Sequence, residues 1–235
     1  TELLNLDNVP HRIECYDISN ISGANNVGAQ IVYKNAFPSK KDYRVYNIKN
    51  VSGSNDYECM KETIFRRISE FYKEEDALKN GTFSKEMTKF YPLPDLILLD
   101  GGIGHVSVVK ELLEGLGEKI PVFGLVKDSR HKTRGINDGE SEINLDNKSD
   151  LFLFLTGIQE EVHRFAINQF RKKHQKNTVA SELEKIKGVG AKRRIELLKY
   201  FKSLNKIKNA SIEDLNIVVD RSTAENIYNY FNKKW

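Results

Sequence analysis

The sequence predicts an α/β domain built on a mixed sheet, followed by a small all-α domain. Three features predict this class. Three β-prone segments come early in the chain, a strand–helix–strand pattern follows, and only short helical patterns remain beyond residue 176. The 235 residues, 39% hydrophobic and 30% charged, are enough for one medium and one small domain. We therefore expect domains at residues 1–176 and 177–235.

Three consecutive strands with short connections predict an antiparallel meander at the start of the first domain. Arg12–Ile18 and Val27–Lys34 are apolar-rich runs separated by a cluster of Ser, Asn and Gly. Tyr43–Ile48 alternates β-prone with polar side chains. The period then becomes helical over Tyr57–Tyr72, after a capping sequence at Ser54–Asp56.

A pair of parallel strands is predicted next. Pro94–Asp100 and Pro121–Val126 are continuous apolar runs, as expected of strands covered on both faces. The amphipathic helix His105–Leu116 between them implies a right-handed crossover. We expect a small hairpin within the polar segment Lys127–Ser149, and then a long helix from about Asp150 to His174.

The second domain is predicted to be a cluster of short helices beyond a linker at Asn177–Ser181. Such short helices must pack on one another to be stable. We place them at Glu182–Ile186, Ala191–Phe201, Ile212–Leu215 and Thr223–Phe231.

Charge separates the two parts of the chain. The net charge is +4, but residues 181–235 hold 12 Lys and Arg against 7 Asp and Glu, while the first 180 residues hold 25 against 26. A near-neutral body with a basic end indicates a catalytic or scaffolding part joined to an anion-binding part. A solvated, lysine-rich surface would give the same counts.

Several protein classes are excluded by composition. No apolar run approaches the ~20 residues of a membrane span. The start of the chain, with Glu2 and Asp7, lacks the basic and apolar parts of a signal peptide. Two cysteines, Cys15 and Cys59, cannot form a zinc ribbon or a disulfide framework. We expect a cytoplasmic protein with no membrane partner.

Two aspartates end predicted strands. Asp17 closes the first strand and Asp100 closes the most apolar one, where an unpaired carboxylate is costly. If the two strands are adjacent and parallel, both carboxylates lie at one edge of the sheet, where they could bind Mg²⁺ or Mn²⁺. The alternative is that Asp17 caps the following turn and Asp100 caps the following helix.

A glycine-rich turn, Asp100–Gly104, follows the second of these aspartates. It lacks the Lys-Ser/Thr pair of a P-loop and the spacing of a dinucleotide fingerprint. We expect its glycines to let the backbone and a bulky ligand approach the carboxylate.

The long predicted helix carries His163 at the border of its apolar stripe. A histidine there is commonly a satisfied residue at the edge of a core, but Arg164 and further basic residues follow it. A basic helix with one border histidine suits a site that handles phosphates. A second basic cluster, which could also be a solvated loop, comprises Lys127, Arg130, Lys132 and Arg134.

The sharpest local motif is Ile186-Lys187-Gly188-Val189-Gly190, with Lys192, Arg193 and Arg194 in the helix that follows. The glycines allow a tight hairpin whose backbone N–H groups, at a helix N-terminus, can donate to a DNA phosphate. The basic residues would add affinity without reading bases. This is a helix-hairpin-helix pattern; a plain helical hairpin closed by glycine is the alternative.

Four segments together carry a resemblance to a known family: RIECYDISN, LPDLILLDGGIGHV, EEVHRFAI and SELEKIKGVGAKRRIELLKYF. In this order they closely resemble the C-terminal half of the UvrC family of bacterial nucleotide-excision-repair endonucleases. The resemblance implies a ribonuclease H-like endonuclease domain followed by a tandem helix-hairpin-helix domain. It also implies an enzyme that makes the 5′ incision beside a DNA lesion with a divalent metal, Mg²⁺ or Mn²⁺.

The family's site residues fall on three positions of this sequence: Asp17 in YDIS, Asp100 in LLDGG and His163 in EVHRF. The resemblance implies that the aspartates are metal ligands, and that His163 is a further ligand or helps to activate water. The implied partners are damaged double-stranded DNA and the helicase subunit UvrB, which would bind through a segment absent from this chain.

The sequence departs from the family pattern in two places. Ile103 and His105 stand where many members have Lys and Gln, so we expect a basic contact to DNA to be either missing or replaced here. The second hairpin, Val218-Val219-Asp220, contains no glycine, and Asp220 would repel a phosphate.

Two other functions stay open from the sequence. One is a non-catalytic module that binds DNA and docks partners; the coexistence of Asp17, Asp100 and His163 argues against it. The other is a resolvase- or transposase-like nuclease on the same fold, which would share the metal chemistry and differ in its DNA substrate.

Overall fold

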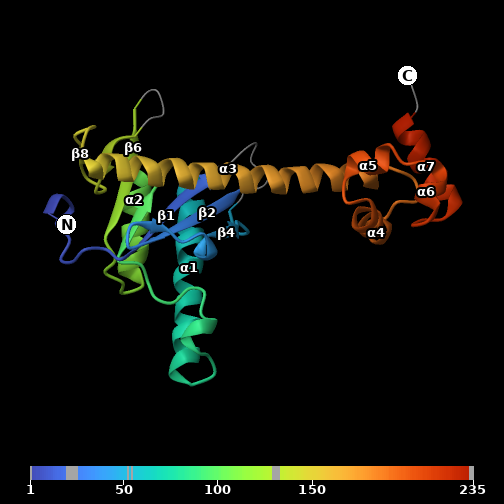
Figure 1. The fold of residues 1–235 in the computed structure, drawn as a ribbon. Helices are drawn as coiled ribbons and strands as arrows, with labels where there is room; N and C mark the ends of the chain where they lie inside the picture. Colours follow the sequence, from blue (N-terminus) through green and yellow to red (C-terminus); the bar gives the residue numbers. More distant parts are fainter. Residues whose placement is uncertain (1, 20–25, 52, 54, 129–132, 233–235) are drawn as a thin grey trace. The chain divides into compact units, whose positions relative to one another are not determined.

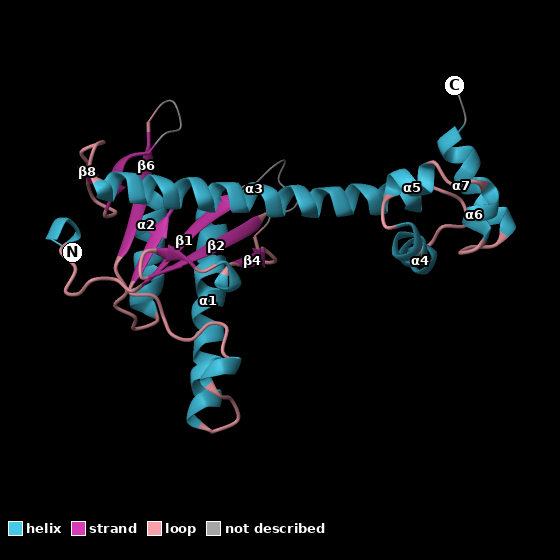
Figure 2. Cartoon of the chain, in the orientation of Figure 1, coloured by secondary structure: helices cyan, strands magenta, loops and turns pink. Residues whose placement is uncertain are grey.

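The computed structural model of the chain describes residues 2–19, 26–51, 53, 55–128 and 133–232. The chain divides into two compact units, Thr1–Phe170 and Arg171–Trp235. The first is a mixed α/β unit and the second is helical (Figures 1 and 2). Helix α3 (Asp150–Glu184) begins in the first unit and ends in the second, and the predicted domain division at residue 176 falls inside it.

One sheet forms the centre of the first unit. Its strand order is β3-β2-β1-β5-β6-β7-β8, with β4 also paired to β2. Strands β1, β5 and β6 are parallel to one another, and the remaining pairs are antiparallel. The predicted combination of a meander and parallel strands is therefore confirmed. The strands are β1 (Arg12–Ser19), β2 (Val27–Lys34), β3 (Phe37–Pro38), β4 (Arg44–Asn47), β5 (Leu96–Leu99), β6 (Val122–Lys127), β7 (Thr133–Asn137) and β8 (Glu142–Asn144).

Helices cover both faces of this sheet (Figure 1). Helices α1 (Asp56–Lys79) and α2 (Ile103–Gly115) pack on one face, and α3 packs on the other. Short 3-10 turns lie in the connections at Glu2–Leu4, Lys40–Asp42 and Lys85–Met87. Asn55 caps α1 by accepting a hydrogen bond from the Glu58 N–H, as the predicted capping sequence requires; Ser54 lies outside the described residues.

The period-2 alternation of strands decides which side chains meet which helix. Along β1, Ile13 and Cys15 contact the α3 core cluster, whereas Tyr16 belongs to the core on the α1 and α2 side. Along β5, Leu98 faces α3 and Leu99 faces α1 and α2. Both faces of these strands are therefore buried, which explains their continuous apolar sequence.

A buried ionic cluster attaches β1 to α1. Glu14 accepts hydrogen bonds from Arg12 Nε at 2.8 Å, from the Tyr16 hydroxyl at 2.5 Å and from Arg67 Nη2 at 2.9 Å. Burial favours the neutral acid, but the charges of Arg67 and Arg12 outweigh it and hold the pKa of Glu14 below its ordinary value. The cluster fixes the strand on which Asp17 lies.

The second unit packs short helices around its own apolar core. They are the end of α3, then α4 (Ala191–Phe201), α5 (Leu204–Lys208), α6 (Ile212–Asn216) and α7 (Arg221–Asn232). Leu183, Val189 and Leu197 are buried in this core, and Leu198 packs against it. Ile195 is 61% exposed and takes no part in it.

Three sequence expectations differ from the structure. The helix predicted to end near His174 continues to Glu184, so the expected linker is helical; the segment contains no Gly or Pro to stop it. Helix α5, which is five residues long and capped by Ser203, was not predicted. The predicted hairpin in Lys127–Ser149 exists as β7 and β8, but β7 also extends the sheet by pairing with β6. Among the described residues, no helix is both long and apolar enough to cross a membrane.

Candidate metal centre

The register of two parallel strands, β1 and β5, places the two predicted aspartates next to each other. Tyr16 of β1 pairs with Leu99 of β5, and the Asp100 N–H donates to the Tyr16 carbonyl at 2.8 Å. Asp17 directly follows Tyr16, and Asp100 directly follows Leu99. Because successive side chains of a strand point to opposite faces of the sheet, both aspartates point toward α3. The predicted adjacency of the two strand ends is confirmed, and α2 is capped by Gly102 rather than by Asp100.

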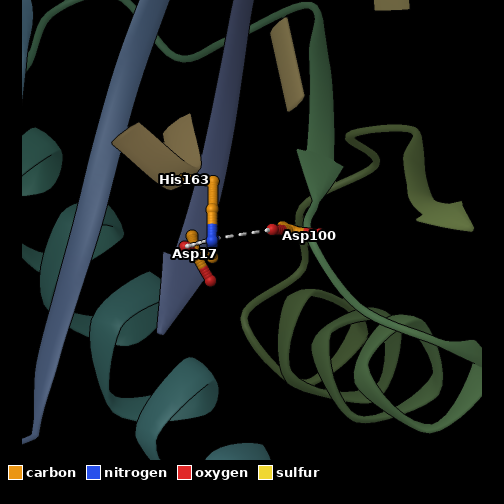
Figure 3. Close-up of side chains that lie close together, drawn as sticks. All are labelled: Asp17, Asp100 and His163. Atoms are coloured by element: carbon orange, nitrogen blue, oxygen red, sulfur yellow. Dashed lines mark hydrogen bonds and ion pairs between the residues drawn. The ribbon is translucent and has the colours of Figure 1, made fainter. Parts of the chain in front are cut away.

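Helix α3 brings His163 to the same point (Figure 3). Its Nδ1 lies 3.2 Å from Asp17 Oδ2 and 3.8 Å from Asp100 Oδ2. One ligand atom from each of the three residues lies within 4.8 Å of the others. The side chain of Asp17 is 9% exposed and that of Asp100 is 4% exposed, whereas the side chain of His163 is 53% exposed. A ligand can therefore reach these three residues from the side of His163.

Two further side chains contact Asp100. Lys127 Nζ lies 2.7 Å from Asp100 Oδ2, and Gln159 Nε2 donates to Asp100 Oδ1 at 2.9 Å. Sequence reasoning placed Lys127 only in a basic cluster and did not consider Gln159. The alternation of side chains along β6 could have predicted the position of Lys127. Phe123, Leu125 and Lys127 point to the same face of the sheet, and Asp100 points to that face too. Arg130 and Lys132 of that cluster lie outside the described residues.

Burial and neighbouring charges shift the pKa values of the groups in the centre. Burial raises the pKa of Asp17, although the hydrogen bond with His163 acts in the opposite direction. That same hydrogen bond raises the pKa of His163. Burial and the nearby charges of Asp100 and Asp17 raise the pKa of the Cys15 thiol. Two carboxylates that share a buried site repel each other, and a cation relieves that repulsion.

The donor set fits a divalent metal. Carboxylate oxygens are the preferred protein ligands of Mg²⁺ and Mn²⁺, and Mn²⁺ also accepts an imidazole nitrogen. Asp17, Asp100 and His163 supply two carboxylates and one imidazole that converge at one point (Figure 3).

Two glycines of the glycine-rich turn lie against aromatic side chains of the protein itself. A Cβ on Gly101 would lie 2.7 Å from the ring of His105, and one on Gly104 would lie 2.8 Å from the ring of Tyr57. Those two rings are paired, with centroids 4.6 Å apart. Gly101 and Gly104 therefore make room for an aromatic pair within the protein.

A pocket of about 880 Å³ opens beside the centre. Lys127, Gln159 and His163 line one part of it, and Arg134 adds a second basic group. Acidic side chains, among them Glu160, line it too. The volume is within the range of small-molecule sites and admits a nucleotide-sized group.

The first hairpin of the helical unit has the backbone that the sequence predicted. Gly188 has φ +91°, where a Cβ is strained and would also lie 2.8 Å from Thr223 Oγ1. Gly190 caps α4 in an exposed position, and the side chains of Lys187 and Lys192 are exposed. Val189 is buried between them.

The two arginines of this motif have partners inside the unit. Arg193 donates to the Gly188 carbonyl and to Thr223 Oγ1, both at 2.9 Å, and pairs with Asp220 at 2.6 Å. Arg194 pairs with Glu184. In the α/β unit, Arg164, the other basic residue predicted to contact DNA, pairs with Glu161 at 2.7 Å. No ion pair of Lys187 or Lys192 occurs among the described residues.

The second hairpin has its helix N-terminus occupied. Asp220 accepts hydrogen bonds from the Thr223 N–H and Oγ1, both at 3.0 Å, at the start of α7. Its carboxylate thus sits where a phosphate would have to bind. Val219 is buried, Val218 packs against the same core, and Ile217 at the tip is 64% exposed.

Comparison with known proteins assigns the two units separately. A family model described as "UvrC RNAse H endonuclease domain" matches residues 1–167, and one described as "SAM-like Helix-hairpin-helix tandem" matches residues 180–233. Proteins named UvrABC system protein C are similar over nearly the whole chain. That of Thermoanaerobacter sp. (strain X514) is 45% identical over 99% of this chain and 38% of its own length. That of Clostridioides difficile (strain 630) is 44% identical over 99% of this chain and 36% of its own length.

This chain spans little more than a third of the length of the curated relatives it matches. The match of the endonuclease model covers well over half of the chain, and it agrees with the sheet order and the converging acidic side chains described above. The chain therefore belongs to the UvrC family and contains its ribonuclease H-like endonuclease domain followed by a helix-hairpin-helix domain.

Proposed function

We propose that the chain is a divalent-metal-dependent DNA endonuclease that makes the 5′ incision beside a lesion in bacterial nucleotide excision repair. The observation that carries this proposal is the convergence of Asp17, Asp100 and His163 at one edge of a ribonuclease H-like sheet. Family membership supports the nuclease class, and the ligand geometry supports the metal requirement.

Each residue of the centre has a defined part in this proposal. Asp17 and Asp100 would hold Mg²⁺ or Mn²⁺ through their Oδ2 atoms, and His163 would be the third ligand through Nδ1. When bound, such an ion activates water and stabilises charge on a phosphodiester. Lys127 keeps a positive charge beside Asp100 and lines the pocket, where it would attract the DNA phosphate.

The helical unit would bind the DNA backbone through its first hairpin. The exposed turn at Gly188 and Gly190 presents backbone N–H groups at the start of α4, and Lys187 and Lys192 add charge. Arg193 would act mainly by holding this hairpin against α7, because its guanidinium is already occupied. The second hairpin would contribute little, because Asp220 fills its helix N-terminus.

The partners follow from the same assignment. The substrate would be damaged double-stranded DNA, and the helicase subunit UvrB would deliver it. The reaction would take place in the bacterial cytoplasm, where the DNA is.

Metal removal and restoration tests the nuclease proposal. Incision of a lesion-bearing duplex, measured with UvrB and with this chain joined to the remaining segments of a full-length UvrC-family protein, is expected to stop in EDTA and to return when Mg²⁺ or Mn²⁺ is added in excess. Because the proposed ligands are oxygen-rich, both ions are expected to restore it. Incision that continues at full rate in EDTA would exclude the mechanism. Faster cutting of branched than of lesion-bearing DNA would favour a resolvase-like substrate instead.

A further inference from the structure

Gln159 is a buried neutral amide in direct contact with the metal centre. It lies on α3 one helical turn before His163 and is only 3% exposed. Its Nε2 donates to Asp100 Oδ1 at 2.9 Å and to the Leu125 carbonyl at 3.2 Å. Its Oε1 accepts a hydrogen bond from Thr133 Oγ1 at 2.5 Å. All polar atoms of the amide therefore have partners.

These partners fix which end of the amide faces Asp100. The Leu125 carbonyl can only accept a hydrogen bond, so the amide nitrogen must lie on that side. Thr133 completes the arrangement by donating to the amide oxygen. The amide thus presents an N–H group to Asp100.

The contact also decides which carboxylate oxygen of Asp100 faces His163. Oδ1 accepts a hydrogen bond from the Gln159 amide, whereas Oδ2 lies 3.8 Å from His163 Nδ1 and 2.7 Å from Lys127 Nζ. The carboxylate cannot rotate about its Cβ–Cγ bond without breaking the hydrogen bond to Gln159. Oδ2 is therefore held toward Asp17 and His163.

We propose that Gln159 is a positioning residue for the metal centre: it orients the Asp100 carboxylate and ties the helix that carries His163 to strands β6 and β7. This inference rests on the metal-dependent nuclease proposed above. Hydrogen bonds to the non-coordinating atoms of metal ligands are commonly worth a factor of 10 to 100 in metal affinity or activity.

The test is Mn²⁺ binding measured by titration calorimetry without DNA. Gln159→Met keeps the length of the side chain and removes every hydrogen bond. It is expected to weaken Mn²⁺ binding roughly 10- to 100-fold. Incision by the same variant is expected to recover largely at saturating Mn²⁺, because the three ligands remain. The control Gln169→Met makes the same change on α3, where the side chain has no hydrogen bond among the described residues; its binding should match the wild type.

A second variant covers the case in which Gln159→Met does not fold. Thr133→Val removes only the hydroxyl that orients the amide, and it should weaken Mn²⁺ binding in the same direction by a smaller factor. Thermal unfolding without metal identifies a variant that is not folded. If the wild type binds Mn²⁺ and both folded variants bind it equally well, the role of Gln159 is refuted while the nuclease proposal stands. If the wild type itself binds no Mn²⁺, the nuclease proposal fails, and this inference fails with it.

Discussion

Replacing Asp100 by asparagine is expected to lower the incision rate by at least about 1,000-fold, as losses of central catalytic groups generally do. Asparagine keeps the size of the side chain and removes its negative charge. The centre would lose half of its buried carboxylate charge, and Lys127, now without its ion-pair partner 2.7 Å away, would repel a metal ion. The DNA affinity of the variant should stay within about twofold of that of the wild type, because Asp100 is proposed to bind the metal and not to contact the DNA backbone.

The matched control for this variant is Asp95→Asn, near the opposite end of β5. Asp95 Oδ2 accepts hydrogen bonds from the His11 and Arg12 backbone N–H groups at 2.8 and 2.7 Å, and an amide oxygen can accept the same bonds. The rates of both variants are compared in the same full-length UvrC-family context, on one lesion-bearing duplex with UvrB and Mg²⁺ present. An Asp100→Asn variant that cuts at more than a tenth of the wild-type rate would contradict the assigned role.

Removing Lys187 and Lys192, the two exposed lysines of the first hairpin, is expected to weaken DNA binding and to flatten its salt dependence. Each phosphate contact that is lost lowers the slope of log K against log salt by about 0.9, so Lys187→Ala/Lys192→Ala should lower it by about 1.8. The loss of affinity should be similar for all sequences, because phosphate contacts do not read bases.

The control double variant, Lys199→Ala/Lys206→Ala, removes the same charge from exposed positions of the same unit. Binding of both variants to a fluorescent duplex is measured over a series of salt concentrations. Equal slopes for the two double variants would mean that net charge, and not the hairpin, governs binding, and would contradict the proposed interface.

The positions of the two aspartates could be predicted because the pattern that indicates them lies within a few neighbouring residues. Asp17 and Asp100 each end a strongly apolar run, and the parallel pairing of β1 and β5 brings such strand ends together. The sequence pattern for His163 is weaker: it shows a histidine at the border of an apolar stripe on a basic helix, and the distance of that helix from the sheet edge depends on tertiary packing. The resemblance to a family was needed to place His163 with the two aspartates.

The parts of the centre that the sequence missed depend on hydrogen bonds between distant segments. Gln159 joins Asp100, 59 residues away, and Leu125, 34 residues away, and no spacing rule links these positions. The partners of Arg193 were missed for the same reason, since Thr223 lies 30 residues further along the chain. From the sequence, Arg193 was expected to be available to DNA, but in the fold it contacts Gly188, Thr223 and Asp220.

The central claim is that Asp17, Asp100 and His163 bind one divalent cation. The most direct test is an anomalous-scattering map from crystals of the chain soaked in Mn²⁺, because it locates the ion without requiring any cutting activity. We expect a peak within coordination distance, about 2.0–2.3 Å, of Asp17 Oδ2, Asp100 Oδ2 and His163 Nδ1. The absence of a peak at saturating Mn²⁺, with all three side chains ordered, would contradict the assignment.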